Sequence, residues 1–174
     1  EQLGADIEII PYKTWQHIST ALPQKENNKW CRIAKNTGEL FDSPIEIGNH
    51  TSYFFDAANV SHELAMYGKG NCDIEKLIAD LKKIIEIETS IFGAHPCKNY
   101  VFINHLTDSS YGGLEHAHSS VNHITRWSFS KENYQSAISL LAHEYFHLWN
   151  VKRIKPEAFI PFNYQTENHT DLLW

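Results

Sequence analysis

The strongest constraint on how this chain folds is a long amphipathic segment between Asp73 and Gly93. Apolar side chains recur there at helical spacing: Ile74, Leu77, Ile78, Leu81, Ile84, Ile85 and Ile91. Asp73 can cap the first turn, and Gly93 can adopt the left-handed conformation that ends many helices. The pattern predicts a helix between these two residues.

Most of the sequence before this segment predicts strands and loops. Residues 1–41 contain several prolines and asparagines that interrupt short apolar runs, and residues 7–10 and 30–33 are predicted strands. Asp42-Ser43-Pro44 indicates a domain junction. Residues 52–55 and 63–67 are further predicted strands, residues 100–103 suit a buried strand, and residues 107–113 are turn-rich.

Composition excludes several classes of partner. The 174 residues are 42% hydrophobic and 13% aromatic, which is typical of a folded globular protein. A net charge of -6 without long runs of one sign argues against nucleic acid or an anionic membrane as partner. No apolar run reaches the roughly 20 residues that span a bilayer, and no signal peptide is visible. Cys31, Cys72 and Cys97 form no disulfide framework. The compartment, cytoplasm or periplasm, and the oligomeric state stay open.

A second helix contains the chemically informative motif. We expect it to begin at Ser130 as N-cap, with Phe129 and Tyr134 forming a hydrophobic staple, and to run to about Trp149. Inside it stands His143-Glu144-Tyr145-Phe146-His147, which matches the HExxH pattern. Residues four apart share a helix face, so His143 and His147 can bind one cation with Glu144 beside them.

This arrangement predicts a zinc site that hydrolyses peptide bonds. Zinc polarises a carbonyl and lowers the pKa of its bound water to about 7. Glu144 is the candidate base that accepts the proton of this water and returns it to the leaving amine. The alternative is a chance coincidence in a chain with 11 histidines. A catalytic site needs a third ligand, for which Glu167 is a minor candidate.

The motif and its surroundings resemble the glycyl aminopeptidase family of zinc peptidases. The similarity is carried by residues 143–156 and by Gly112-Gly113-Leu114-Glu115-His116. Residues 42–48, Phe92-Gly93 and residues 167–174 extend it over nearly the whole chain.

The resemblance implies an α+β fold of the gluzincin type. Residues 42–174 would be a thermolysin-like catalytic domain with a mixed sheet and the HExxH helix, and residues 1–41 would be the end of an N-terminal β domain. A downstream PDZ domain is common in the family. The third zinc ligand would be a glutamate shortly after Trp174, so we expect a piece of a longer protein, inactive and weak in zinc binding by itself.

The residue types in Gly112–Glu115 would suit binding of a peptide substrate. Two glycines leave room for a substrate backbone, and an extended peptide can pair with a strand edge there. Glu115 could bind the substrate's amino terminus and place the first peptide bond at the zinc. The alternative is a glycine turn followed by a solvated glutamate.

The expected function is therefore that of a zinc aminopeptidase acting on peptides, with small N-terminal residues such as glycine or alanine suggested by the resemblance. An inactive peptide-binding scaffold is the alternative, and a structural zinc site is disfavoured because no closed four-ligand set is present. His116, His118 and His123 fit no ligand pattern and are expected to be ordinary polar residues. The role of Lys152 and Arg153 stays open.

Overall fold

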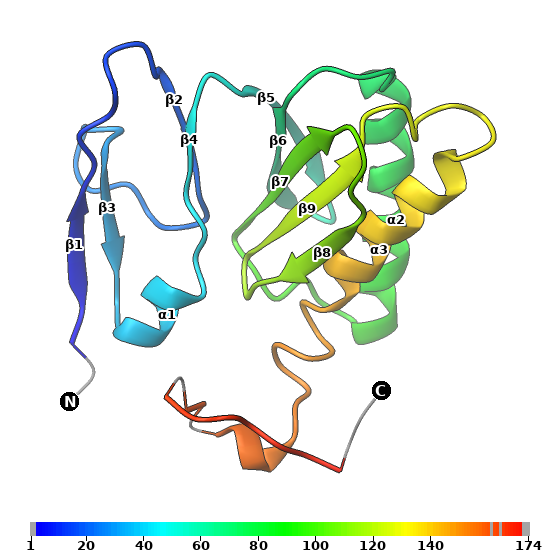
Figure 1. Cartoon of the computed structure of the whole chain (residues 1–174). Helices are drawn as coiled ribbons and strands as arrows, with labels where there is room; N and C mark the ends of the chain where they lie inside the picture. Colours follow the sequence, from blue (N-terminus) through cyan, green and yellow to red (C-terminus); the bar gives the residue numbers. More distant parts are fainter. Residues whose placement is uncertain (1–2, 161, 164, 172–174) are drawn as a thin grey trace.

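The computed structural model describes residues 3–160, 162–163 and 165–171. Its largest part is a five-stranded sheet with two helices on one face, and short strand pairs precede it (Figure 1). The elements before the sheet are β1 (Ala5–Glu8), β2 (His17–Ser19), β3 (Cys31–Ala34), α1 (Thr37–Phe41) and β4 (Glu46–Gly48). Those that follow are β5 (Thr51–Ala57), β6 (Val60–Tyr67), α2 (Ile74–Phe92), β7 (Asn99–Thr107), β8 (Gly112–Glu115), β9 (Ser119–Thr125), α3 (Tyr134–Phe146) and the 3-10 helix η1 (Glu157–Phe159).

The central sheet is mixed, with strand order β5-β6-β7-β9-β8. β5 and β6 form an antiparallel hairpin, β7 lies parallel to β6 and to β9, and β8 closes the far edge antiparallel to β9. The parallel β6–β7 pair requires a crossover, which α2 supplies. The prediction of a mixed α+β fold is confirmed, and no strand among the described residues pairs with the outer side of β8 at the edge of this sheet.

Helix α2 forms where the apolar periodicity predicts it. The Asp73 side chain accepts a hydrogen bond of 3.0 Å from the Lys76 N–H, and Gly93 ends the helix with a φ of 82°. Leu77, Leu81 and Ile85 are completely buried against the sheet. The bounds of this helix are as predicted, and the buried residues belong to the predicted apolar face, but Ile91 in its last turn is exposed.

Helix α3 begins later and ends earlier than the sequence predicts. Its N-cap is Asn133, whose side chain makes no capping hydrogen bond, and residues 130–133 form a turn in which the Ser130 carbonyl accepts from Asn133 and Tyr134. The predicted cap at Ser130 is therefore wrong. Tyr134 is held by a hydrogen bond of 2.9 Å from its hydroxyl to Asp80 of α2, and this contact fixes the helix start. His147 is the C-cap, and turns replace the predicted last helical residues up to Trp149.

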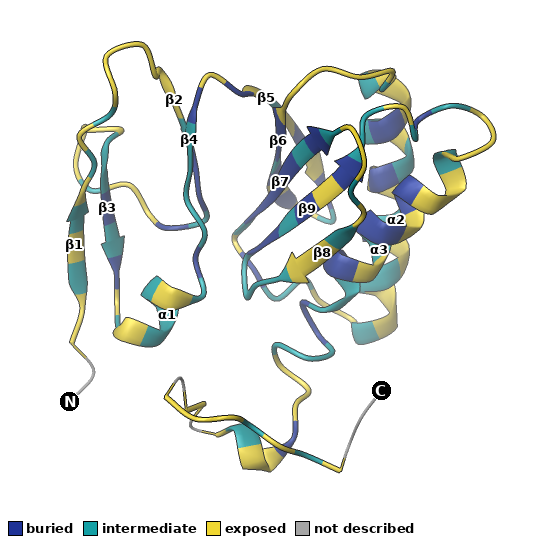
Figure 2. Cartoon of the chain, in the orientation of Figure 1, coloured by how far each residue is buried: buried dark blue, intermediate teal, exposed yellow. Residues whose placement is uncertain are grey.

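The core lies between the sheet and the two helices (Figure 2). Tyr100 and Phe102 of β7, Leu64 of β6 and Tyr145 of α3 are fully buried within it. Burial of such side chains is the main force that holds α3 on the sheet. The face of α3 that carries Glu144 is turned toward Gly113 of β8.

The N-terminal strand pairs join the central sheet through polar contacts. Ser19 of β2 and Ser52 of β5 both donate hydrogen bonds to Glu63 of β6, and Glu46 of β4 bonds to His105 of β7 at 2.9 Å. β4 follows the predicted domain junction but pairs with β2, which precedes it. The division into domains at residues 41 and 42 stays a prediction.

The remaining strand predictions are close to the observed strands. The strand predicted at 7–10 lies at Ala5–Glu8, and that at 30–33 lies at Cys31–Ala34. Those at 52–55, 63–67 and 100–103 are confirmed as parts of β5, β6 and β7. Across the described ranges, none of the helices has both the length and the apolar character needed to cross a membrane.

Candidate active site

Helix α3 brings the two motif histidines together at its C-terminal end. The Nε2 atoms of His143 and His147 lie 3.1 Å apart. The Nδ1 of His147 donates a hydrogen bond of 2.6 Å to the Asn150 carbonyl, because a carbonyl can only accept. This bond leaves the Nε2 lone pair of His147 directed toward His143, and a hydrogen bond of this kind is typical of histidine ligands.

This pair of nitrogens fits a zinc ion. In tetrahedral coordination, two zinc–nitrogen bonds of about 2.05 Å separate the nitrogens by about 3.3 Å, close to the observed distance. The negative end of the α3 dipole, where His147 caps the helix, also favours a cation. The donor chemistry and geometry of His143 and His147 therefore suit the metal.

Glu144 lies beside the two histidines and is almost completely buried. Its side chain is 4% exposed, and its Oε2 atom has no hydrogen-bond partner among the described residues. Burial raises the pKa of Glu144, and Glu115 raises it further, whereas His143 and His147 lower it. A carboxylate that is short of partners and has a raised pKa is suited to accept a proton.

Strand β8 runs along the motif helix and presents glycine to it. A Cβ added at Gly113 would lie 2.4 Å from the Glu144 carboxyl carbon, so the missing side chain makes room for this carboxylate. A Cβ at Gly112 would meet nothing, but its φ of 155° disfavours other residues. The unpaired side of β8 next to Glu144 is an edge to which an extended peptide can add.

Glu115, at the end of β8, shares the site with Glu144 and His147. One ligand atom from each of the three residues falls within 4.8 Å of the other two. This cluster contains two carboxylates, yet we regard the two histidines as the zinc ligands because their Nε2 atoms converge. Carboxylates in such a position are chemically able to accept a proton or to bind an ammonium group.

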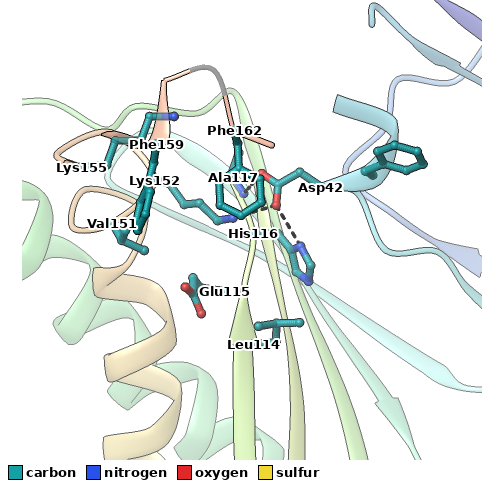
Figure 3. A pocket seen from close by; sticks show the side chains of 11 residues that line it. Asp42, Leu114, Glu115, His116, Ala117, Val151, Lys152, Lys155, Phe159 and Phe162 are labelled. Atoms are coloured by element: carbon teal, nitrogen blue, oxygen red, sulfur yellow. Dashed lines mark hydrogen bonds and ion pairs between the residues drawn. The ribbon is translucent and has the colours of Figure 1, made fainter. Parts of the chain in front are cut away.

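A cavity of about 580 Å³ opens next to Glu115 (Figure 3). Its walls come from β8, from the segment after α3 and from the end of α1, and they include Leu114, Val151 and Phe159 as apolar members. Figure 3 shows the Glu115 carboxylate on the side of α3 and His116 on the side of Asp42.

The other sequence candidates lie apart from this cluster. Glu167 forms an exposed ion pair of 3.4 Å with His169. His116 binds Asp42, while His123 contacts the ring of His105. The last part of the resemblance, residues 172–174, lies outside the described residues, so the third zinc ligand expected after it stays a prediction.

Two groups of contacts around the site could not be predicted from the sequence. The Tyr145 hydroxyl bonds to both His62 and His95, at 2.8 Å and 2.5 Å, inside the core. The Asp42 carboxylate binds His116, Ala117 and Lys152. His62 directly precedes the strand predicted at residues 63–67 and lies in the observed β6, and no spacing in the sequence links it or Asp42 to the motif.

Comparison with known proteins supports the peptidase family that the sequence resembles. Residues 136–174 match the sequence profile of the M61 glycyl aminopeptidase family. A search of curated proteins finds no match. The crystal structure of an aminopeptidase N family protein from Idiomarina loihiensis is 33% identical and superposes with a TM-score of 0.94 over 99% of this chain. The chain spans only 32% of that protein's length.

More distant structures share the fold. Native yeast LTA4 hydrolase is 16% identical, with a TM-score of 0.54 over 85% of this chain and 22% of its own. An M1 zinc metallopeptidase mutant from Deinococcus radiodurans is 10% identical, with a TM-score of 0.51 over 78% of this chain and 32% of its own. The family match at the motif and the close superposition of the whole chain agree, and together they support a zinc peptidase of the glycyl aminopeptidase type.

Proposed function

We propose that this chain carries the catalytic motif of a zinc-dependent aminopeptidase that hydrolyses peptide bonds near the amino terminus of peptides. The observation that carries the proposal is the convergence of His143 and His147 Nε2 at 3.1 Å beside the buried Glu144. The family match supports an aminopeptidase, and residues 42–174 are proposed to form a thermolysin-like catalytic domain after the end of a β domain.

His143 and His147 would hold the zinc ion. Bound zinc supplies a polarised carbonyl and a water of lowered pKa. Glu144 accepts a proton at its carboxylate and later delivers it to the leaving amine, and the pKa raised by burial favours the first of these two transfers. Burial of this carboxylate also excludes competing water from the proton path.

The substrate is positioned by β8 and Glu115. A peptide adds to the free edge of β8 through backbone hydrogen bonds, and Gly113 permits close approach beside Glu144. The Glu115 carboxylate binds the substrate ammonium group by a charge-assisted hydrogen bond. Because Glu115 and His147 share one cluster, the bond that is cleaved lies close to the peptide's first residue.

We propose a preference for small first residues such as glycine or alanine. Support comes from the name of the matching family, glycyl aminopeptidase. The neighbouring cavity of about 580 Å³ has room for larger groups. A panel of glycyl, alanyl, leucyl and phenylalanyl chromogenic amides tests whether small or large first residues are preferred. Equal or higher kcat/KM for the leucyl and phenylalanyl amides rejects the preference for small residues.

The central test uses the full-length protein and its Glu144→Gln variant. We expect a zinc chelator to abolish hydrolysis of aminoacyl amides and added zinc to restore it. Glu144→Gln keeps the size of the side chain but cannot accept the proton, so kcat should fall by about 100-fold or more. Glu167→Gln, at an exposed ion pair, serves as control and should retain activity. Full activity of Glu144→Gln rejects this residue as the base.

A further inference from the structure

One carboxylate joins the substrate-binding strand to the segment that follows the zinc motif. The Asp42 Oδ1 atom accepts from Lys152 Nζ at 2.8 Å and from His116 Nδ1 at 3.1 Å, while Oδ2 accepts from the Ala117 N–H at 3.0 Å (Figure 3). His116 and Ala117 directly follow Glu115, and Lys152 lies five residues after His147. Asp42 itself caps the end of α1.

The backbone at Ala117 is held from its other side as well. Arg153 donates from Nη1 and Nη2 to the Ala117 carbonyl, at 3.3 Å and 3.2 Å, and from Nη1 to the Leu148 carbonyl at 2.7 Å. Ala117 therefore has its N–H bound to Asp42 and its carbonyl bound to Arg153. Lys152 and Arg153, which follow α3, therefore both make hydrogen bonds that hold the residues after β8, Lys152 through Asp42 and Arg153 directly.

The surroundings of Asp42 keep its carboxylate ionised and bound to its three donors. The Asp42 and Lys152 side chains are 22% and 23% exposed, so solvent screens their ion pair only in part. Burial raises the pKa of Asp42, but the hydrogen bonds from His116, Lys152 and Ala117 outweigh it and leave the pKa below its usual value. Asp42 is thus ionised at neutral pH, as three converging donors require.

We propose that Asp42 is a positioning residue that fixes the distance between Glu115 and the zinc-binding histidines, and thereby the recognition of a free amino terminus. The proposal rests on the aminopeptidase function proposed above. Asp42 acts only through the backbone and side chains on either side of it. Loss of its carboxylate loosens the β8 end against the segment after α3 and leaves the motif residues themselves unchanged.

The test is Asp42→Asn in the full-length protein. An asparagine has one acceptor oxygen, and its amide group would face at least one of the three donors whichever way it is turned. We expect KM for aminoacyl amides to rise about tenfold or more while kcat changes less, because binding of the ammonium group weakens and the base is intact. The preference for a free over an N-acetylated peptide should fall in parallel.

Two further variants separate positioning from general damage. Asp108→Asn removes a carboxylate from an ion pair with Arg126, near the start of β8, and should leave KM and the preference for free amines unchanged. Lys152→Met removes one donor and keeps Asp42, so it should shift KM in the same direction by less. It also provides the test if Asp42→Asn does not fold. Bound zinc and melting temperature are measured for each variant.

The outcomes distinguish the two proposals. Unchanged KM and unchanged amine preference in folded Asp42→Asn, or in Lys152→Met if the former is not folded, overturns the positioning role. A fall in kcat that follows loss of zinc, at constant KM, also overturns it. Insensitivity of the wild-type protein to chelator, or absence of aminoacyl amide hydrolysis, rejects the aminopeptidase function itself.

Discussion

The two glycines of β8 differ in what a side chain would meet. Gly113 lies against the Glu144 carboxylate, whereas Gly112 faces open space with a positive φ. The sequence predicts that both glycines allow a substrate backbone to approach, and in the structure Gly113 also leaves room for the Glu144 carboxylate. At this scale, one missing methyl group determines where the proposed base can lie.

Gly113→Ala should therefore impair activity more than stability. The new methyl group would overlap Glu144 and force it aside, and a displacement of about 1 Å at a reacting group can cost about 100-fold in rate. Gly48→Ala, where a Cβ meets nothing, is the matched control and should retain kcat. The check is kcat/KM for an aminoacyl amide together with bound zinc. Wild-type kcat in Gly113→Ala would show that Glu144 can move without loss.

Tyr145 binds the buried His62 and the partly buried His95, and because its hydroxyl has one hydrogen, one imidazole accepts from it and the other donates to it. His62 donates from Nδ1 to the Val60 carbonyl at 2.9 Å, so its Nε2 accepts from the Tyr145 hydroxyl. His95 Nδ1 accepts from the Cys97 N–H at 3.0 Å, so its Nε2 donates to the same hydroxyl. The motif helix is thus hydrogen-bonded to β6 and to the loop after α2.

Tyr145→Phe should destabilise the protein by about 1–3 kcal/mol, because it removes the partner of Nε2 in the buried His62 and in the partly buried His95. Tyr111→Phe removes an exposed hydroxyl that bonds to the Ser136 carbonyl at 3.2 Å, and it should cost little. Urea denaturation of both variants measures the difference. Equal midpoints would show that the network contributes nothing.

At the scale of elements, the two helices differ in how they begin. The Asp73 side chain caps α2, while that of Asn133 makes no capping bond to α3. The start of α3 is instead fixed by Tyr134, which binds Asp80 of α2 and lies under the Lys76 ammonium group at 3.6 Å from the ring centroid. One helix start is therefore determined locally and the other by its neighbour.

Asp73→Ala should cost about 1 kcal/mol of unfolding free energy, as the loss of an N-cap usually does. Asn133 is also an N-cap but makes no side-chain capping bond, so Asn133→Ala should change the unfolding free energy by less than about 0.5 kcal/mol. Thermal or urea unfolding of both variants measures the two losses of stability. A larger loss at Asn133 would contradict the assigned cap.

Elements whose signal is local were predictable from the sequence. α2 carries its own periodicity and boundary residues and appears as expected, and the apolar run predicted as a strand at residues 100–103 lies inside the longer β7. β9 was not predicted because polar residues, Ser120 and Asn122, are buried in it and hide the alternation. The histidines and Glu144 were predictable because one helix carries them. Asp42 was not, because its partners lie 74 to 110 positions away and only the folded chain brings them together.

At the scale of the whole molecule, the interior holds ionisable groups in their neutral forms. Burial lowers the pKa of His62 to about 4, and it also lowers those of His50, His95 and His118. Burial raises the pKa of Glu88 to about 8. These two kinds of group give opposite slopes of stability against pH.

The sign follows from which state binds more protons. Near pH 5 the unfolded state protonates His62 and the folded state does not, so its stabilising contribution is full above about pH 6.5 and is lost as pH falls toward 4. Glu88 is protonated in the folded state but ionised when unfolded, so stability falls as pH rises from about 4.5 toward 8. We expect His62→Gln to lose stability less steeply on acidification, and Glu88→Gln to lose it less steeply toward pH 8.

Urea denaturation at several pH values measures both slopes. His123→Gln, an exposed histidine on β9, is the control and should keep the wild-type profile. A wild-type slope in His62→Gln between pH 6.5 and 4 would show that this side chain does not remain neutral inside the protein.

The unpaired edge of β8 also restricts which substrates the proposed aminopeptidase could accept. A chain that joins this edge must be locally unfolded and must offer its own amides in register, so tightly folded amino termini are poor substrates. An imino acid lacks the amide hydrogen and cannot complete the pairing where that hydrogen faces β8. Tolerance of proline along the first few substrate positions should therefore alternate, with a period of two residues.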